Sequence, residues 1–166
     1  MGIGVDIAQE QKLSRDTSER ISKLYAEKGQ PVSCVSGCFH CCKLDVACLP
    51  QEVEVLADKV ISGEVGINLD RLERKVRGSK DSEDSWCPFL EGGKCSVYNN
   101  RPMMCSRMLV VSPKENCEED SDKTKTQVFH NKMDKRYGIL FSTFGRVILH
   151  HALFNMLVRG GMIQCP

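Results

Sequence analysis

Eight of the chain's ten cysteines gather in two segments, residues 34–42 and 87–117. They are Cys34, Cys38, Cys41 and Cys42 in the first segment and Cys87, Cys95, Cys105 and Cys117 in the second. Thiolate sulfur is a favoured ligand of zinc and of iron–sulfur clusters. Eight thiolates match two Cys₄ zinc ions or two four-iron clusters, and one centre with additional core cysteines is the alternative. We therefore predict a cysteine-ligated metal centre with these eight residues as its ligands.

The spacing in the first segment brings its thiols together in either of two backbone conformations. In a helix, the spacing of Cys34, Cys38, Cys41 and Cys42 places all four on one face. In a loop, Cys38-x-x-Cys41 has the spacing common in zinc sites. Cys41 and Cys42 are chain neighbours, and neighbouring side chains rarely point at one ion. We expect them to serve different ions, different irons of one cluster, or one ligand role and one core role.

Three other features bear on the predicted centre. Cys105 lies just inside a helix start marked by Pro102, and a helix N-terminus lowers a thiol's pKa. Cys48 and Cys165 stand apart from the two segments, and we interpret them as core residues. His40 lies inside the first segment, and we interpret it as a solvent-facing loop residue, with metal ligand or proton donor as the alternatives.

The length and composition favour one intracellular domain. At 166 residues, the chain suits a single domain spanning residues 1–166. No run reaches the roughly 18 apolar residues of a membrane span, and the start lacks the features of a signal peptide. We therefore expect a cytoplasmic protein with no membrane partner. In that reducing compartment, clustered cysteines indicate metal binding in preference to the alternative, a secreted disulfide scaffold.

Charge is unevenly distributed along the chain. The net charge is +1, but residues 123–166 carry seven Lys or Arg against one Asp, and the preceding residues carry 16 basic and 21 acidic side chains. A basic region can contact an acidic partner or nucleic acid. Here the bases are scattered and no aromatic residues interleave with them. We interpret the region as a solvated helix face and do not expect nucleic acid as a partner.

The pattern of apolar residues, glycines and prolines predicts an α+β fold, predominantly helical. We expect helices over 17–27, 50–62, 69–77, 128–137 and 140–157, a β-hairpin over 89–98, and a short strand over 108–111. Pro50 and the capping residue Asn68 mark the starts of the second and third helices, and Gly92-Gly93 marks the turn of the hairpin. The last two helices could instead be one helix kinked at Gly138. On it, one of His150 and His151 should be buried and the other exposed, because adjacent residues do not share a helix face. The expectation is a small irregular cysteine-cluster metal-binding domain over 33–117, with C-terminal helices over 126–160 forming the wall of any pocket beside the centre.

The order and spacing of several motifs resemble a known family. The matching residues are the stretch from Ser33 to Cys42, Glu52, the stretch Cys87-Pro88-Phe89-Leu90, the stretch from Gly93 to Cys105, Ser112 and Cys117. The chain resembles the YkgJ-like or CxxCxxCC cysteine-cluster proteins, described as zinc- or iron-chelating. The resemblance covers residues 33–117. It implies an intracellular protein whose eight shared cysteines bind zinc or an iron–sulfur cluster.

One branch of that family implies a more specific chemistry. A flagellin lysine methylase carries a similar cluster, which implies a [4Fe-4S] cluster and S-adenosylmethionine as cofactors in that branch. The present chain departs from the family at one point. The family usually has Arg directly after the third cysteine of the second segment, whereas here Ser106 follows Cys105 and Arg107 comes next.

Several functions are compatible with this sequence. Metal binding is the principal prediction, and the spacing alone does not distinguish zinc from an iron–sulfur cluster. The alternatives are a methyltransferase acting on protein lysine, a redox or oxygen-sensing iron–sulfur protein, and a structural module that binds a protein partner. A radical S-adenosylmethionine enzyme is disfavoured, because the chain is short compared with the roughly 250 residues of a full barrel. Whether the chain is an enzyme, as a methyltransferase or an oxidoreductase, is left open.

Overall fold

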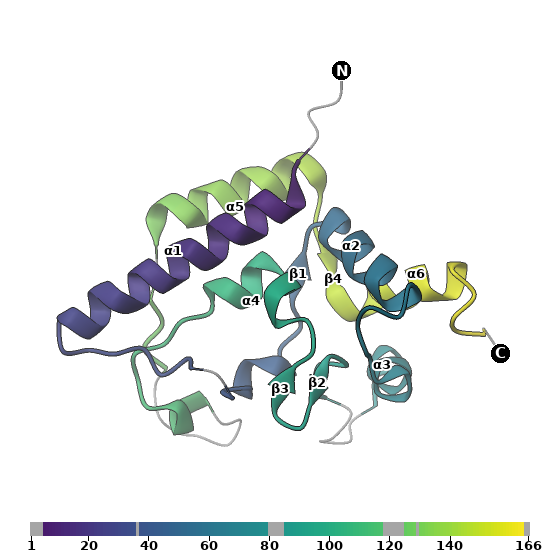
Figure 1. Ribbon diagram of the computed structural model, residues 1–166, viewed down its shortest axis with the longest axis horizontal. Coiled ribbons are helices and arrows are strands. Elements are labelled where there is room, and N and C mark those ends of the chain that lie inside the picture. Colours follow the sequence, from purple (N-terminus) through teal and green to yellow (C-terminus); the bar gives the residue numbers. More distant parts are fainter. Residues whose placement is uncertain (1–4, 36, 80–84, 118–124, 129, 165–166) are drawn as a thin grey trace.

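Two groups of helices flank a short pair of strands (Figure 1). The computed structural model describes residues 5–35, 37–79, 85–117, 125–128 and 130–164. The α-helices within these ranges are α1 (Ile7–Glu27), α2 (Pro50–Ile61), α3 (Leu69–Val76), α4 (Met103–Arg107), α5 (Asn131–Phe144) and α6 (Leu149–Arg159). The 3₁₀ helices are η1 (His40–Lys43), η2 (Tyr98–Asn100) and η3 (Lys114–Cys117). The strands are β1 (Ala47–Cys48), β2 (Leu90–Glu91), β3 (Lys94–Cys95) and β4 (Val147–Ile148). The predicted α+β, predominantly helical fold is confirmed.

The strands form two small antiparallel sheets. Strand β1 pairs with β4, so that Ala47 faces Ile148, and β2 pairs with β3, so that Leu90 faces Cys95. The second pair is the predicted hairpin, and it lies at the lower edge of the molecule in Figure 1. None of the helices in the described ranges combines the length and apolar character needed to cross a bilayer.

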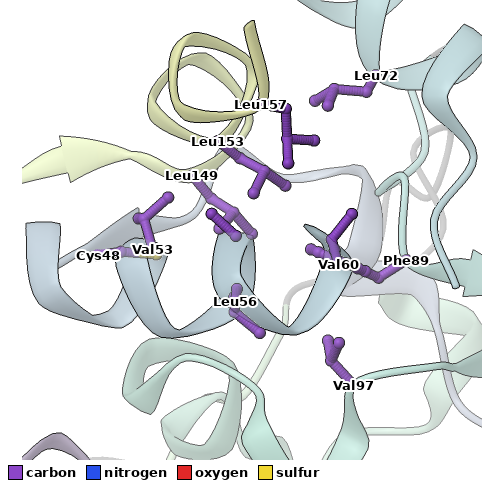
Figure 2. Packing of buried hydrophobic residues seen from close by; sticks show 11 residues of the cluster. Cys48, Val53, Leu56, Val60, Leu72, Phe89, Val97, Leu149, Leu153 and Leu157 are labelled. Atoms are coloured by element: carbon purple, nitrogen blue, oxygen red, sulfur yellow. The ribbon is translucent and has the colours of Figure 1, made fainter. Parts of the chain in front are cut away.

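The largest core joins α2, α3 and α6 (Figure 2). Its fully or almost fully buried members include Val53, Leu56, Val60, Leu72, Leu149, Leu153, Leu157, Phe89 and Val97. Phe89 and Val97 flank the hairpin, so the same core that holds the helices together also anchors the strands carrying Cys95. The expected starts of α2 at Pro50 and of α3 after the Asn68 cap are confirmed, and the Asn68 side chain accepts a hydrogen bond from the Arg71 amide.

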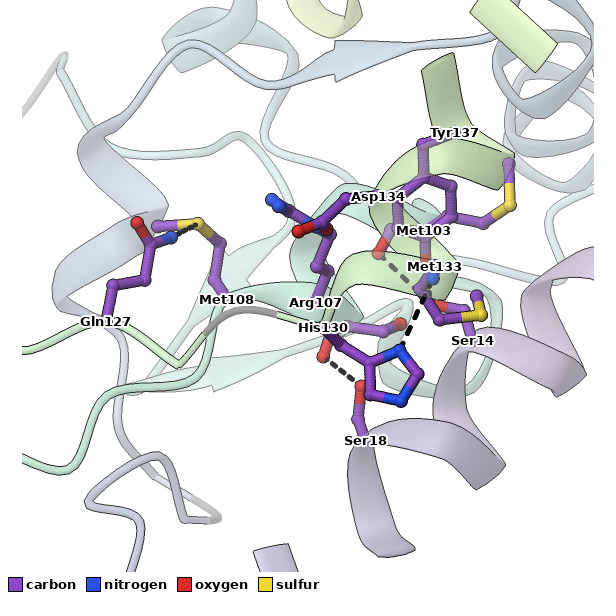
Figure 3. Close-up of polar contacts among 11 residues, drawn as sticks. Ser14, Ser18, Met103, Arg107, Met108, Gln127, His130, Met133, Asp134 and Tyr137 are labelled. Carbon is purple, nitrogen blue, oxygen red and sulfur yellow. Dashed lines mark hydrogen bonds and ion pairs between the residues drawn. The ribbon is translucent and has the colours of Figure 1, made fainter. Parts of the chain in front are cut away.

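The first helix is ten residues longer than the sequence pattern predicts, starting at Ile7 instead of residue 17. The added turns bury polar side chains, so they lack the apolar stripe that reveals a helix in sequence. Ser14 and Tyr137 of α5 share a hydrogen bond of 2.5 Å between their hydroxyls (Figure 3). The Ser18 hydroxyl donates to the Ser106 carbonyl at 2.7 Å. Hydrogen bonds to α4 and α5 therefore fix α1 where an apolar face is missing.

Two expectations for the second half of the chain are wrong. Helix α5 continues through Gly138 without a break, and the chain turns at Gly145, whose φ of +84° suits glycine. The strand predicted over 108–111 is reduced to one bridge between Val110 and Gln127. The prediction for the histidine pair is confirmed, because His150 is buried and His151 is exposed.

Glu52 is a fully buried carboxylate that links the two groups of helices. Its Oε2 accepts a hydrogen bond from the Leu49 amide at 3.0 Å, and its Oε1 accepts one from the Met103 amide at 2.8 Å. The Gln11 side chain of α1 also bonds to this carboxyl. Burial raises the pKa of Glu52 and outweighs the opposing effect of these hydrogen bonds. One side chain thus caps α2 and holds the first residue of α4, two positions before Cys105.

We expect Glu52→Gln to lower the free energy of unfolding by about 2 kcal/mol, because an amide has one acceptor oxygen and leaves a buried N–H without a partner. Glu54→Gln is the matched control, since Glu54 is exposed on the same helix, and its cost should stay within about 0.5 kcal/mol. Urea unfolding of both variants measures the difference. Equal stabilities would contradict the role given to Glu52.

Candidate metal centre

All eight cysteines of the two segments line two neighbouring cavities. The aromatic cavity, of about 400 Å³, is bordered by the thiol-bearing residues Cys34, Cys38, Cys41 and Cys117, together with Phe39 and Trp86. The hairpin cavity, of about 250 Å³, is bordered by Cys38, Cys41, Cys42, Cys87, Cys95 and Cys105. The nine cysteines in the described ranges are all free thiols, and Cys165 lies outside those ranges. The ninth, Cys48, is fully buried in the core, as expected.

The first cysteine segment folds as a loop, so the single-helix interpretation of its spacing is wrong. A bend stabilised by the Cys38 amide donating to the Val35 carbonyl leads into η1. Gly37 makes this bend with a φ of +87°, which is accessible to glycine without strain. Within the following 3₁₀ turn, the Cys42 amide donates to the Phe39 carbonyl at 2.8 Å. The turn carries Cys41 towards both cavities.

A backbone hydrogen bond joins the two cysteine segments. The Cys87 amide donates to the Cys42 carbonyl at 2.7 Å, across 44 intervening residues. The hairpin then reverses through Gly92 and Gly93, with φ of +52° and +75°. A Cβ atom on Gly93 would lie 3.4 Å from the Phe39 ring, so the turn packs closely on the first segment. The loop and the hairpin therefore form one unit.

The remaining ligand candidates are fixed by α4 and by the chain after it. Cys105 lies within α4, directly after the Pro102 and Met103 helix start. The Val110 amide donates to Cys34 Sγ at 3.3 Å, and the Ser33 amide donates back to the Val110 carbonyl at 2.8 Å. Cys117 ends η3, which contacts η1. Residues far apart in sequence therefore meet around the aromatic cavity.

Burial raises the pKa of most of these thiols. The pKa values of Cys34 and Cys87 rise to about 11, mainly because burial disfavours the thiolate and to a lesser extent because other thiolates lie nearby. Burial is also the main cause that raises the pKa values of Cys95 and Cys117. The pKa of Cys105 rises well above its usual range, so the predicted lowering at a helix N-terminus is wrong. Desolvation outweighs the small field of a five-residue helix.

The pKa of Cys41 is lowered, because this thiol has a hydrogen-bond donor and a cation nearby. The Cys42 thiol donates to the Cys41 sulfur and lowers the pKa of Cys41 to about 7, to which the charge of Arg101 adds. The same hydrogen bond raises the pKa of Cys42. The Arg101 guanidinium stacks over Tyr98 at 4.0 Å from the ring centroid and borders the hairpin cavity. Arg101 lies in the matched stretch from Gly93 to Cys105, but no pattern in the sequence indicates that its charge acts on Cys41.

The donors fit a thiophilic metal in type but are not in ligand positions. Within the described part of the chain, no three His, Cys, Asp or Glu side chains form a group that could already hold one ion. The thiols are nevertheless close enough to raise one another's pKa, as Cys38, Cys41 and Cys117 do for Cys34. Zinc and iron–sulfur clusters both take four thiolates. Both cavities thus offer donors of the right chemical type for such a metal.

The walls of the cavities differ from the expectation in one respect. The helices after residue 126 were expected to form them, but in the described ranges only Leu149 of α6 borders the hairpin cavity. Helix α5 packs on α1 instead, on the far side of α4. His40 borders the aromatic cavity and stacks on Phe39 at 5.5 Å between ring centroids, so it is not a purely solvent-facing residue.

In reduced, metal-free protein, we expect iodoacetamide to modify Cys41 before Cys34 at neutral pH. The thiolate is the reactive form, and the pKa of Cys41 lies near 7 whereas that of Cys34 lies near 11. As the pH falls below 7, the Cys41 rate should drop by about tenfold per unit. Mass spectrometry of the peptides measures both rates, with buried Cys48 as the unreactive control. Faster modification of Cys34 would contradict the effect of Cys42 on Cys41.

Comparison with known proteins identifies the family of the chain. Searches of curated proteins and of solved structures gave no match. Residues 33–132 match the model of the CxxCxxCC family, described as "Putative zinc- or iron-chelating domain". The match begins at Ser33, as the sequence motifs indicated, and extends past Cys117 to the start of α5. It spans more than half of the chain and supports metal binding. The chain belongs to the CxxCxxCC family of zinc- or iron-chelating domains.

Proposed function

We propose that the chain binds two metal centres, one at each cavity. Cys34, Cys38, Cys41 and Cys117 would hold the first centre, and Cys42, Cys87, Cys95 and Cys105 would hold the second. The observation that carries this assignment is that four of the thiols, Cys42, Cys87, Cys95 and Cys105, border only the hairpin cavity, whereas Cys34 and Cys117 border only the aromatic cavity. Cys38 and Cys41 border both cavities, and they would complete the first centre because the second already has four thiolates. Four thiolates per centre is the number that a Cys₄ zinc ion or a four-iron cluster takes.

The thiols that raise the pKa of Cys34 match the first set, since they are Cys38, Cys41 and Cys117. In the second set, Cys87 and Cys95 raise the pKa values of both Cys42 and Cys105, and Cys41 of the first set acts on them as well. Cys41 borders both cavities, and its assignment to the first centre follows from Cys42, which borders only the second. Neighbouring residues would then ligate different centres, as the sequence suggested.

Bound metal would stabilise the fold by linking cysteines from different segments of the chain. Burial raises the pKa values of these thiols, so they stay protonated when no metal is bound. In each centre, strong metal–thiolate bonds would replace the protonated thiols. The second centre would join η1, the hairpin and α4, which the Cys87–Cys42 backbone bond already holds together. Arg101 would offset part of the thiolate charge there. We also propose that residues 1–166 form one domain, since α6 packs on α2 in the main core. The many free thiols favour the reducing cytoplasm as its compartment.

The identity of the metal decides among the more specific functions. The iron–sulfur-dependent methyltransferase and the redox or oxygen-sensing iron–sulfur protein would both contain a cluster, whereas a module that binds a protein partner would need only zinc. Anaerobic purification, followed by a visible spectrum and metal and sulfide analysis of one sample, tests this. Brown protein with iron and acid-labile sulfide would support a cluster, and colourless protein with zinc would support the module. Absence of both metals would overturn the proposed function.

Cys34→Ser and Cys105→Ser should each remove about half of the bound metal, because each alters a different centre. Cys48→Ala is the control, since Cys48 is buried in the core and borders neither cavity, and it should keep the full metal content. Metal analysis of the three purified variants measures this. If either serine variant loses all the metal while staying folded, a single shared centre replaces the two proposed here.

A further inference from the structure

Helix α3 presents two basic side chains to the cysteine segments. Arg71 and Lys75 are one turn apart and therefore share a face of the helix. The neighbouring stripe of Leu72 and Val76 packs in the main core, which fixes the orientation of that face. The helix lies beside the hairpin (Figure 1), where the Arg71 guanidinium donates to the Leu90 carbonyl at 2.7 Å.

Lys75 joins the two cysteine segments through their backbones. Its ammonium donates to the Ser85 carbonyl at 2.5 Å and to the Lys43 carbonyl at 3.3 Å. Lys43 directly follows Cys42, and Ser85 precedes Cys87 by two residues. The Cys87 amide itself donates to the Cys42 carbonyl. One side chain of α3 therefore holds both segments at the point where their backbones meet.

The charge of Lys75 is buried, and its anionic partner is exposed. The Lys75 side chain is 9% exposed, and a buried ammonium is costly unless negative charge lies close to it. Its two carbonyl partners are neutral. Within the described ranges, the carboxylate that pairs with it is Asp45, at 3.8 Å and with a side chain that is 66% exposed. Water screens such a pair, so the charge of Lys75 is only partly compensated.

The thiolates of a bound metal centre would supply the missing negative charge. Four thiolates outweigh the charge of one divalent zinc ion, so a Cys₄ centre is anionic. Lys75 is close enough to such a centre to act on it, because its charge already lowers the pKa of Cys87 against the larger effect of burial. Metal binding would thus give the buried ammonium a buried anionic partner.

We propose that Lys75 is a positioning residue of the second centre, which holds the Cys42 and Cys87 segments together and stabilises the anionic, metal-loaded state by its charge. This inference rests on the proposed function. It deepens that function, because it assigns a role in metal binding to a side chain that is no ligand and borders neither cavity.

The zinc affinity of full-length variants tests the proposal, with zinc as the probe because thiolate sites bind it. Competition with a chromophoric chelator, on protein shown to be folded by circular dichroism, gives the dissociation constants. Lys75→Met should weaken the binding of one zinc ion by roughly tenfold or more and leave the other unchanged. Lys75→Arg keeps the charge and the donors, so it should restore most of the affinity. Arg77→Met is the matched control and should bind zinc like the wild type, since Arg77 is exposed at the end of α3 and pairs with Glu73.

Asp45→Asn separates the effect of charge from the loss of hydrogen bonds. Removing this exposed carboxylate leaves the Lys75 charge to the centre alone, so zinc binding should tighten by about twofold. His150 lies 3.7 Å from Asp45, but burial lowers the pKa of His150 to about 4, so the neutral ring loses no ion pair at pH 7. A residue that only holds the backbone would give no such gain. If Lys75→Met does not fold, Asp45→Asn decides alone.

Wild-type affinity in Lys75→Met, or no gain in Asp45→Asn, would each overturn the proposal. Variants that bind two zinc ions with wild-type affinity would refute only the role of Lys75. Wild-type protein that binds no zinc would refute the proposed function, and this inference with it.

Discussion

The burial of many thiols in one small region is the constraint on which the rest of this structure depends. Desolvation raises the pKa values of Cys34, Cys87 and Cys105, and each additional thiolate raises them further. Protonated thiols are weak hydrogen-bonding groups, so without metal they contribute little to holding the segments together. A bound metal replaces the protons, and its bonds to the thiolates then hold the segments together. Because the folded pKa values are raised, metal binding should weaken as the pH falls and protons compete for the same sulfurs.

Such a region needs a scaffold that brings its parts together without relying on the thiols. Glu52 provides one part, since it joins the start of α2 to the start of α4 through two backbone amides. The buried polar face of α1 provides another, because Ser18 fixes the Ser106 carbonyl next to Cys105. In both contacts, the buried polar side chain is hydrogen-bonded to the backbone. They specify one position for α4 more sharply than apolar packing alone does.

The sequence predicted those features that depend on local pattern. Pro50 and Asn68 marked helix starts, Gly92-Gly93 marked the hairpin, and the spacing of the cysteines indicated the family. The features it missed depend on tertiary contacts. The first turns of α1 are held by hydrogen bonds to α4 and α5, which no apolar periodicity reveals. The pKa of Cys105 follows its burial, which the helix start at Pro102 did not indicate. The wall of the aromatic cavity combines Phe39 with Trp86, which only the folded chain brings together.

The two cavities differ in a way that bears on where chemistry can occur. The hairpin cavity adjoins the main core through Phe89, Val97 and Leu149, and the exposed residues Lys94 and Tyr98 also border it. The aromatic cavity is larger, and its rim carries Leu44, an exposed apolar side chain. A centre held in the hairpin cavity would join the first cysteine loop, the hairpin and α4, so it would contribute to stability. A centre beside the aromatic cavity adjoins space of ligand size. If the chain is an enzyme, the aromatic cavity offers its substrate more room than the hairpin cavity does, beside the centre that Cys34, Cys38, Cys41 and Cys117 would hold.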